Sequence, residues 1–186
     1  MNKKVMKNIK TNAYTLFKEK GYKETTILDI CEACSITKTT FYRYVHSKED
    51  LLAYYFDDIQ DNLGPLVVQI AQSDNYVENI ICAFDLVINQ MKTFGRDLYS
   101  QLYISNLNTN QDTFEDIPLF QEIVVALIEK GQKNGQIINM ASSQELFQVT
   151  KNLCFGCGIR WCLNQIEDVR EEFVKSIKIV LQVVDD

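Results

Sequence analysis

Apolar residues recur every three or four positions along most of the chain, and breaks in this pattern mark where elements end. Ile9, Ala13, Leu16 and Phe17 recur at helical spacing, and Gly21 follows as a helix stop, which predicts a helix over residues 3–20. The 186 residues contain only two prolines and seven glycines, so few positions interrupt helices. The pattern therefore predicts an all-α protein.

A second, short helix is predicted after this stop. Thr26 can cap this helix at its N-terminus, and Asp29 three residues later suits the positive end of the helix dipole. Its apolar stripe comprises Ile27, Ile30, Cys31 and Cys34. We interpret both cysteines as small buried side chains, because a zinc site would need two further ligands and the chain has one histidine, His46.

A third helix is predicted to begin after Thr37, with Phe41 and Val45 pointing inward. Its outward residues are Lys38, Thr39, Thr40, Tyr42, Arg43 and Tyr44. Two short helices after a longer one are typical of a helix-turn-helix, whose second helix enters the major groove of DNA. Hydroxyls and amides at helix starts suit phosphate oxygens, and cations add charge-assisted bonds.

The rest of the chain also shows helical spacing. A fourth helix is predicted to open at Ser47, in "SKEDLLAYYFDDIQDNL", and Gly64 with Pro65 predicts a kink or break after it. Further helices are predicted over residues 76–94, 96–107, 117–133, 143–165 and 169–184. A polar loop is predicted at "NLNTNQDTFEDIP" and a turn at "KGQKNGQI", which gives about nine helices in all.

Charge is distributed unevenly along the chain, whose formal net charge is −6. Residues 1–48 contain ten Lys and Arg against four Asp and Glu, a net +6, and the remaining residues contain nine against 21, a net −12. A basic N-terminal unit joined to an acidic body is typical of a protein that binds a polyanion through the first unit alone. The alternative is a chance skew among solvated side chains.

Composition is that of an ordinary globular protein, with 46% hydrophobic and 24% charged residues. No apolar run approaches the roughly 18 to 20 residues that a membrane span needs, and the basic start lacks the apolar segment of a secretion signal. We therefore expect a cytoplasmic protein with no membrane partner and six reduced cysteines. The sequence lacks a glycine-rich phosphate loop and a zinc-protease signature, so we expect no enzyme, cofactor or metal.

Two stretches, "LFKEKGYKETTILDI" and "ITKTTFYRYVHSKEDLL", resemble the DNA-binding domain of the tetracycline-repressor (TetR) family of bacterial transcriptional regulators. The resemblance covers about 37 positions between Leu16 and Leu52. It implies a helix-turn-helix domain over residues 1–47 and a helical ligand-binding and dimerisation domain over residues 48–186. It further implies a homodimeric repressor that binds a palindromic double-stranded DNA operator and is released by a small molecule.

The resemblance also implies roles for single residues: Thr26 and Lys48 hold phosphates, and Phe41 anchors the recognition helix. The implied DNA-binding set is Thr26, Thr37, Lys38, Thr39, Thr40, Tyr42, Arg43, Tyr44, His46 and Lys48. Ser35 and Thr39 depart from the family pattern, because glycine is usual at both positions. Ser35 must therefore tolerate the turn conformation, and Thr39 adds a side chain toward the DNA.

For the second domain, the resemblance implies an effector pocket among the central helices. Candidate lining residues are Phe84, Ile88, Met91, Tyr99, Tyr103, Phe120 and Trp161, which suit a lipophilic or aromatic molecule, and the alternative is ordinary core. The candidate dimer interface comprises Cys154, Cys157, Gly158, Phe173, Ile177 and Leu181, and the alternative is core within one chain. A rival function is a thiol-redox or metal-responsive regulator of the same fold that uses Cys154 and Cys157.

Overall fold

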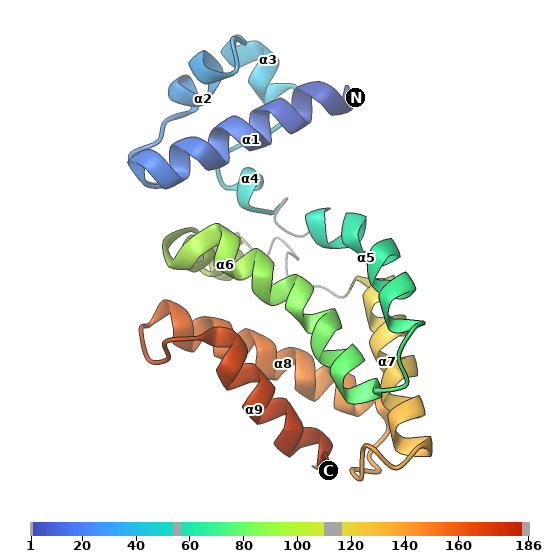
Figure 1. Cartoon of the computed structure of the whole chain (residues 1–186). Coiled ribbons are helices and arrows are strands. Elements are labelled where there is room, and N and C mark those ends of the chain that lie inside the picture. The colour runs from blue at the N-terminus through green and yellow to red at the C-terminus, as the bar shows by residue number, and fades with distance from the viewer. Residues whose placement is uncertain (1, 54–56, 110–116, 184–186) are drawn as a thin grey trace. The chain divides into compact units, whose positions relative to one another are not determined.

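The computed structural model describes residues 2–53, 57–109 and 117–183. The regular elements in these ranges are all helices, which confirms the predicted all-α class (Figure 1). They are α1 (Lys3–Lys20), α2 (Ile27–Ala33), α3 (Lys38–Tyr42), α4 (Asp50–Ala53), α5 (Asp57–Ile70), α6 (Tyr76–Thr109), α7 (Pro118–Lys133), α8 (Ser143–Cys162) and α9 (Val169–Leu181). None of these helices is both long and apolar enough to cross a lipid bilayer.

Contacts divide the chain into two compact units. Unit 1 contains Met1–Phe56 and Phe94–Thr113, and unit 2 contains Asp57–Thr93 and Phe114–Asp186. The predicted DNA-binding head, residues 1–47, falls within unit 1. The functional boundary after residue 47 stays a prediction.

The head has an apolar core formed by α1, α2 and α3. Ile9, Phe17, Ile30 and Phe41 are each at most 2% exposed. Helix α1 ends at the predicted stop, because Gly21 adopts a φ of 87° and its N–H donates to the Phe17 carbonyl at 3.0 Å. The helical spacing along α1 therefore places its apolar face against the two short helices that follow.

Unit 2 is built around four phenylalanine rings. The Phe84 ring in α6 lies 5.3 Å from Phe120 in α7 and 5.0 Å from Phe173 in α9, centroid to centroid. Phe147 in α8 lies 6.3 Å from Phe120, and all four side chains are buried. Aromatic pairs at such spacing stabilise a fold beyond the area that they bury. The cluster thus joins four helices of unit 2.

The predicted break at Gly64 and Pro65 is wrong, because α5 continues through both residues. Both are exposed, so water can bond the carbonyl that the missing proline N–H leaves unpaired. Leu63 and Leu66 beside them are buried, so this face of α5 packs into the core of unit 2. The fourth helix predicted from Ser47 corresponds to α4 and the start of α5, and its residues 54–56 lie outside the described ranges.

The helices predicted over residues 76–94 and 96–107 form one element, α6, with a kink between them. At the kink Gly95 adopts φ 83° and ψ 161°, a conformation that is essentially restricted to glycine. Helices α7, α8 and α9 begin within one residue of the predicted positions. Residues 110–116 of the predicted polar loop lie outside the described ranges.

Candidate nucleic-acid interface

Helix α2 begins with the predicted cap. The Asp29 N–H donates to the Thr26 hydroxyl at 3.2 Å, and the Thr26 N–H donates to the Asp29 carboxylate at 2.8 Å. The Thr26 hydroxyl also donates to Asp29, and Lys20 donates to it at 2.9 Å. Hydrogen bonds from Lys20 and then from Thr26 lower the pKa of Asp29 to about 2. Thr26 is exposed, but its hydroxyl is already bonded within the helix start.

The turn between α2 and α3 accommodates a serine where the family usually has glycine. Ser35 adopts a φ of 54°, in the left-handed region that glycine favours. The Ser35 N–H donates to the Glu32 carbonyl at 3.0 Å, and the Ile36 N–H donates to the Cys31 carbonyl at 2.9 Å. These two bonds close the turn. Cys31 and Cys34 are buried, as their helical spacing predicted.

Helix α3 is capped by a threonine pair. The Thr40 N–H donates to the Thr37 hydroxyl at 3.1 Å, and the two hydroxyl oxygens lie 3.0 Å apart. Phe41 and Val45 are at most 1% exposed, which confirms the predicted inward face. Burial of this face fixes which side chains of α3 point to solvent.

The outer face of α3 carries polar and cationic side chains. Lys38, Thr39, Tyr42, Arg43 and His46 are exposed, whereas Thr40 and Tyr44 are half-buried. The Arg43 guanidinium lies 5.4 Å from the centroid of the Tyr44 ring, and the Tyr42 ring meets Phe41 edge-on at 5.6 Å. Neither Lys38 nor Arg43 forms an ion pair with any residue that the structure describes.

The structure gives Lys48 partners inside unit 1. Its ammonium donates to the carbonyls of Tyr22 at 2.7 Å and Thr25 at 3.0 Å, and lies 4.2 Å from the centroid of the Tyr22 ring. The Tyr22 hydroxyl in turn donates to Glu49 at 3.1 Å. Burial, and then the Glu49 carboxylate, raise the pKa of Tyr22. Lys48 therefore fixes the segment that leads into α2, and its phosphate contact stays a prediction.

Sequence reasoning missed this arrangement of Tyr22, Lys48 and Glu49, although a signal was present. A lysine in the first turn of a helix is disfavoured by the helix dipole. Lys48 could therefore be expected to have a negatively polarised partner, and the structure supplies carbonyl oxygens from the chain itself. Lys48 lies 26 positions after Tyr22, so a local sequence pattern does not reveal this contact.

The predicted pocket residues are placed mostly in apolar cores. Phe84, Ile88, Met91, Tyr99, Phe120 and Trp161 are buried, and Tyr103 is half-buried. Tyr99 and Tyr103 belong to unit 1 and the other five to unit 2. Thr150 in α8 adds a feature that the sequence did not reveal: its hydroxyl is fully buried and has no hydrogen-bond partner among the described residues.

The predicted dimer residues on α8 and α9 lie inside the single chain. Cys154, Cys157, Gly158, Phe173, Ile177 and Leu181 are all buried in unit 2. Other apolar side chains on the same helices are exposed, namely Val149, Ile159, Leu163 and Ile179. Gly156 lies among them on α8 with open space where a Cβ would stand.

The thiols of Cys154 and Cys157 are poorly suited to redox chemistry. Burial raises the pKa of both thiols, so the reactive thiolate is disfavoured. No cluster of three or more His, Cys, Asp or Glu side chains that could hold a metal ion is found in the described part of the chain.

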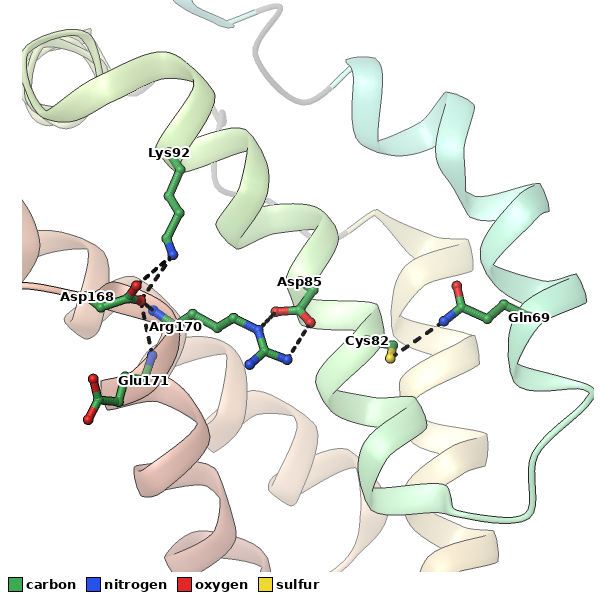
Figure 2. Close-up of polar contacts among 7 residues, drawn as sticks. All are labelled: Gln69, Cys82, Asp85, Lys92, Asp168, Arg170 and Glu171. Carbon is green, nitrogen blue, oxygen red and sulfur yellow. Dashed lines mark hydrogen bonds and ion pairs between the residues drawn. The ribbon is translucent and has the colours of Figure 1, made fainter.

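Charged side chains connect α6 to the start of α9 in unit 2 (Figure 2). Arg170 donates to both carboxylate oxygens of Asp85, at 2.8 and 2.9 Å. Lys92 donates to Asp168, the N-cap of α9, at 3.0 Å. Lys92 and Arg170 are thus each paired with a carboxylate of a neighbouring segment.

Comparison with known proteins finds a family that matches the head and regulators that are similar to a larger part of the chain. Residues 9–55 match the family described as bacterial regulatory proteins, tetR family. The HTH-type transcriptional repressor KstR2 of Rhodococcus jostii is 23% identical over 163 residues, which cover 80% of this chain and 75% of that protein. IcaR of Staphylococcus aureus, a negative transcriptional regulator of the biofilm operon icaADBC, is 28% identical over 104 residues, 54% of this chain and 53% of its own length.

A solved structure shares the fold over nearly the whole chain. The crystal structure of Thermus thermophilus FadR, a TetR-family transcriptional repressor in complex with lauroyl-CoA, superimposes with a TM-score of 0.74. It is 23% identical, and the match covers 97% of this chain and 96% of FadR. The arrangement of a helix-turn-helix followed by further helices is therefore shared with this repressor.

Proposed function

We propose that this chain is a homodimeric repressor of the tetR family of bacterial regulatory proteins, released from a palindromic DNA operator by a small molecule. The observation that carries the proposal is the exposed outer face of α3, which lies within the matched residues 9–55. The protein acts in the cytoplasm, where bacterial DNA is found.

Arg43 is the proposed base-reading residue. A guanidinium can donate two parallel hydrogen bonds to O6 and N7 of guanine, the commonest specific contact in the major groove. Exposure leaves this group accessible, and the Tyr44 ring restricts its orientation. Thr39 and Tyr42 are exposed on the same helix and complete the surface that enters the groove.

Phosphate contacts are proposed for the rim of this surface. Lys38 and His46 are exposed and can approach the DNA backbone. Thr37 and Thr40 share one hydroxyl proton between their oxygens, so the second proton is available to a phosphate oxygen. Together these groups position the head, while Arg43 supplies sequence preference.

The proposed dimer uses the outer faces of α8 and α9. Val149, Ile159, Leu163 and Ile179 are between 44% and 70% exposed, an arrangement that suits burial against a second copy. The open space at Gly156 would allow two α8 helices to approach closely. Two heads on a two-fold axis would then read the two halves of a palindrome.

The proposed effector is lipophilic and binds within unit 2. The phenylalanine cluster offers apolar contacts, and the unpartnered Thr150 hydroxyl offers one buried polar contact that a ligand could satisfy. Lauroyl-CoA is the first molecule to test, because FadR of similar fold was crystallised with it. We expect it to lower operator affinity, since an effector acts only by binding one conformation better than the other.

The experiment selects operators from random duplexes and measures affinity at increasing salt. We expect Arg43→Ala to weaken binding to the selected operator by roughly 10- to 100-fold, with little change on unrelated duplex. Lys18→Ala is the matched control, because it removes one exposed cation of the head outside α3. Equal affinity of the unaltered protein for selected and unrelated DNA would overturn the proposal.

A further inference from the structure

We propose that unit 2 contains a second small-molecule site, a cleft of about 590 Å³ that binds small zwitterions carrying one ammonium and one carboxylate. The cleft lies where α6 begins and where α7 and α9 end. Figure 1 shows these three helix ends at the same end of unit 2. None of the four phenylalanines of the central cluster lines it, so it is separate from the proposed effector pocket. Its volume is within the range of sites for small ligands.

One wall of the cleft is held by the side chain of Gln136. Its amide oxygen accepts from the Tyr76 N–H at 2.7 Å, and its amide nitrogen donates to the Asp74 carbonyl at 2.7 Å. These bonds join the segment before α6 to the loop after α7. The segment before α6 and the loop after α7, which form two walls of the cleft, are therefore held at a fixed separation.

The same loop is also bonded to the end of α9. The N–H groups of Ile138 and Asn139 donate to the carbonyls of Gln182 and Leu181, both at 3.3 Å. The Asn139 side chain donates to the Val180 carbonyl at 2.8 Å. A connecting loop with this many bonds is pre-formed, so little conformational freedom is lost when a ligand binds.

The lining of the cleft has the chemistry of a zwitterion site. Val77 and Ile81 are buried and give it an apolar floor. Asp74 and Glu78 contribute carboxylates, and Lys178 from α9 contributes an ammonium. A ligand with both charges can pair with both kinds of group, whereas a simple cation or anion pairs with only one.

The excess of negative charge fixes which ligand group is bound most strongly. Besides the two carboxylates, the C-terminal ends of α7 and α9 place partial negative charge near the cleft. We therefore expect the ligand ammonium to lie on the side of Asp74 and Glu78. The carboxylate then lies toward Lys178, and an apolar side chain can cover Val77 and Ile81.

The test uses the purified full chain and titration calorimetry with each of the twenty standard amino acids. At least one is expected to bind. Its N-acetyl derivative, which lacks the ammonium, and its methyl ester, which lacks the carboxylate, are each expected to bind at least tenfold more weakly. DNA is absent, so the outcome is independent of the proposed repressor function.

Variants that remove one charge from the cleft test whether the amino acid binds there. Glu78→Gln and Lys178→Gln are expected to weaken binding of the same amino acid at least tenfold, and both replace exposed side chains, so folding should be retained. Lys175→Gln is the matched control, because it is exposed on α9 but does not line the cleft. Failure of all twenty to bind, equal binding of either derivative, or unchanged affinity in either cleft variant would overturn the proposal.

Discussion

The outer face of α3 and the contact between α6 and α9 in unit 2 differ in what their charged side chains do. In unit 2, Lys92 and Arg170 are paired with carboxylates of neighbouring helices (Figure 2). On α3, Lys38 and Arg43 are exposed and form no ion pair with any described residue. A cation that is already paired gains less from a phosphate, because it must first give up its carboxylate. The exposed Lys38 and Arg43 are therefore better placed to bind a phosphate than Lys92 and Arg170.

The two regions also differ in how they are held together. Unit 2 is centred on the rings of Phe84, Phe120, Phe147 and Phe173. Both units also contain side chains that bond the backbone of distant segments, such as Lys48 to Tyr22 in unit 1 and Asn139 to Val180 in unit 2. We infer that the smaller head, which has fewer buried side chains to stabilise it, is more sensitive than unit 2 to the loss of one such bond.

The largest expected effect tests the aromatic core. Phe173→Ala should lower the free energy of unfolding by about 3–5 kcal/mol, because Phe173 is fully buried and contacts the Phe84 ring. Ile179→Ala on the same helix should change it by less than about 1 kcal/mol at low protein concentration, because Ile179 is 70% exposed. Denaturant titration gives both values. Equal losses would contradict the assignment of these two faces of α9.

The next effect tests the polar contacts of unit 1. Lys48→Met keeps the apolar stem but removes the ammonium from the carbonyls of Tyr22 and Thr25. We expect it to lower the free energy of unfolding by roughly 1.5–3 kcal/mol, the usual value for hydrogen bonds to a charged group. Lys18→Met, which removes an exposed cation at the end of α1, should have little effect on stability.

The same two variants separate stability from DNA contact. If Lys48 also holds a phosphate, the slope of log affinity against log salt should flatten by about 0.9 in Lys48→Met and stay unchanged in Lys18→Met. A stable Lys48→Met protein with a flattened slope would restore the role that the family resemblance implied. Lost stability with an unchanged slope would assign Lys48 to the fold alone.

Contacts between residues close in sequence could be predicted from the sequence, whereas contacts between distant residues could not. Helix starts at Thr26, Thr37 and Ser142 depend on neighbours three residues away, so local pattern is sufficient to locate them. The partners of Lys48 are 23 and 26 residues distant and belong to a turn without periodicity. A helical apolar stripe also does not reveal whether it faces its own chain or a second copy. For this reason Cys154, Phe173 and their neighbours were assigned to a dimer interface although they are buried in one chain.

A smaller effect compares the same capping device in both regions. Thr26 caps α2 and Ser142 caps α8, each with a carboxylate three residues later. Thr26→Ala and Ser142→Ala should each lower stability by about 1 kcal/mol. Hydrogen exchange should show the loss at the start of α2 in one variant and at the start of α8 in the other. A much larger loss for Thr26→Ala would support the view that the smaller head is more sensitive to the loss of one polar contact.

The smallest expected effect is the pH dependence of the α2 cap. The pKa of Asp29 is lowered from 3.8 to about 2, so the carboxylate stabilises the head above pH 4 and this contribution is lost as the pH falls toward 2. Lys20→Met removes the largest cause of the shift and should move the NMR titration midpoint of Asp29 back toward 3.8. Hydrogen bonds from Ser142 lower the pKa of Glu145 in unit 2, without a lysine partner among their causes. The Glu145 midpoint should therefore not respond to Lys20→Met, and a parallel shift of both carboxylates would indicate a global change in folding.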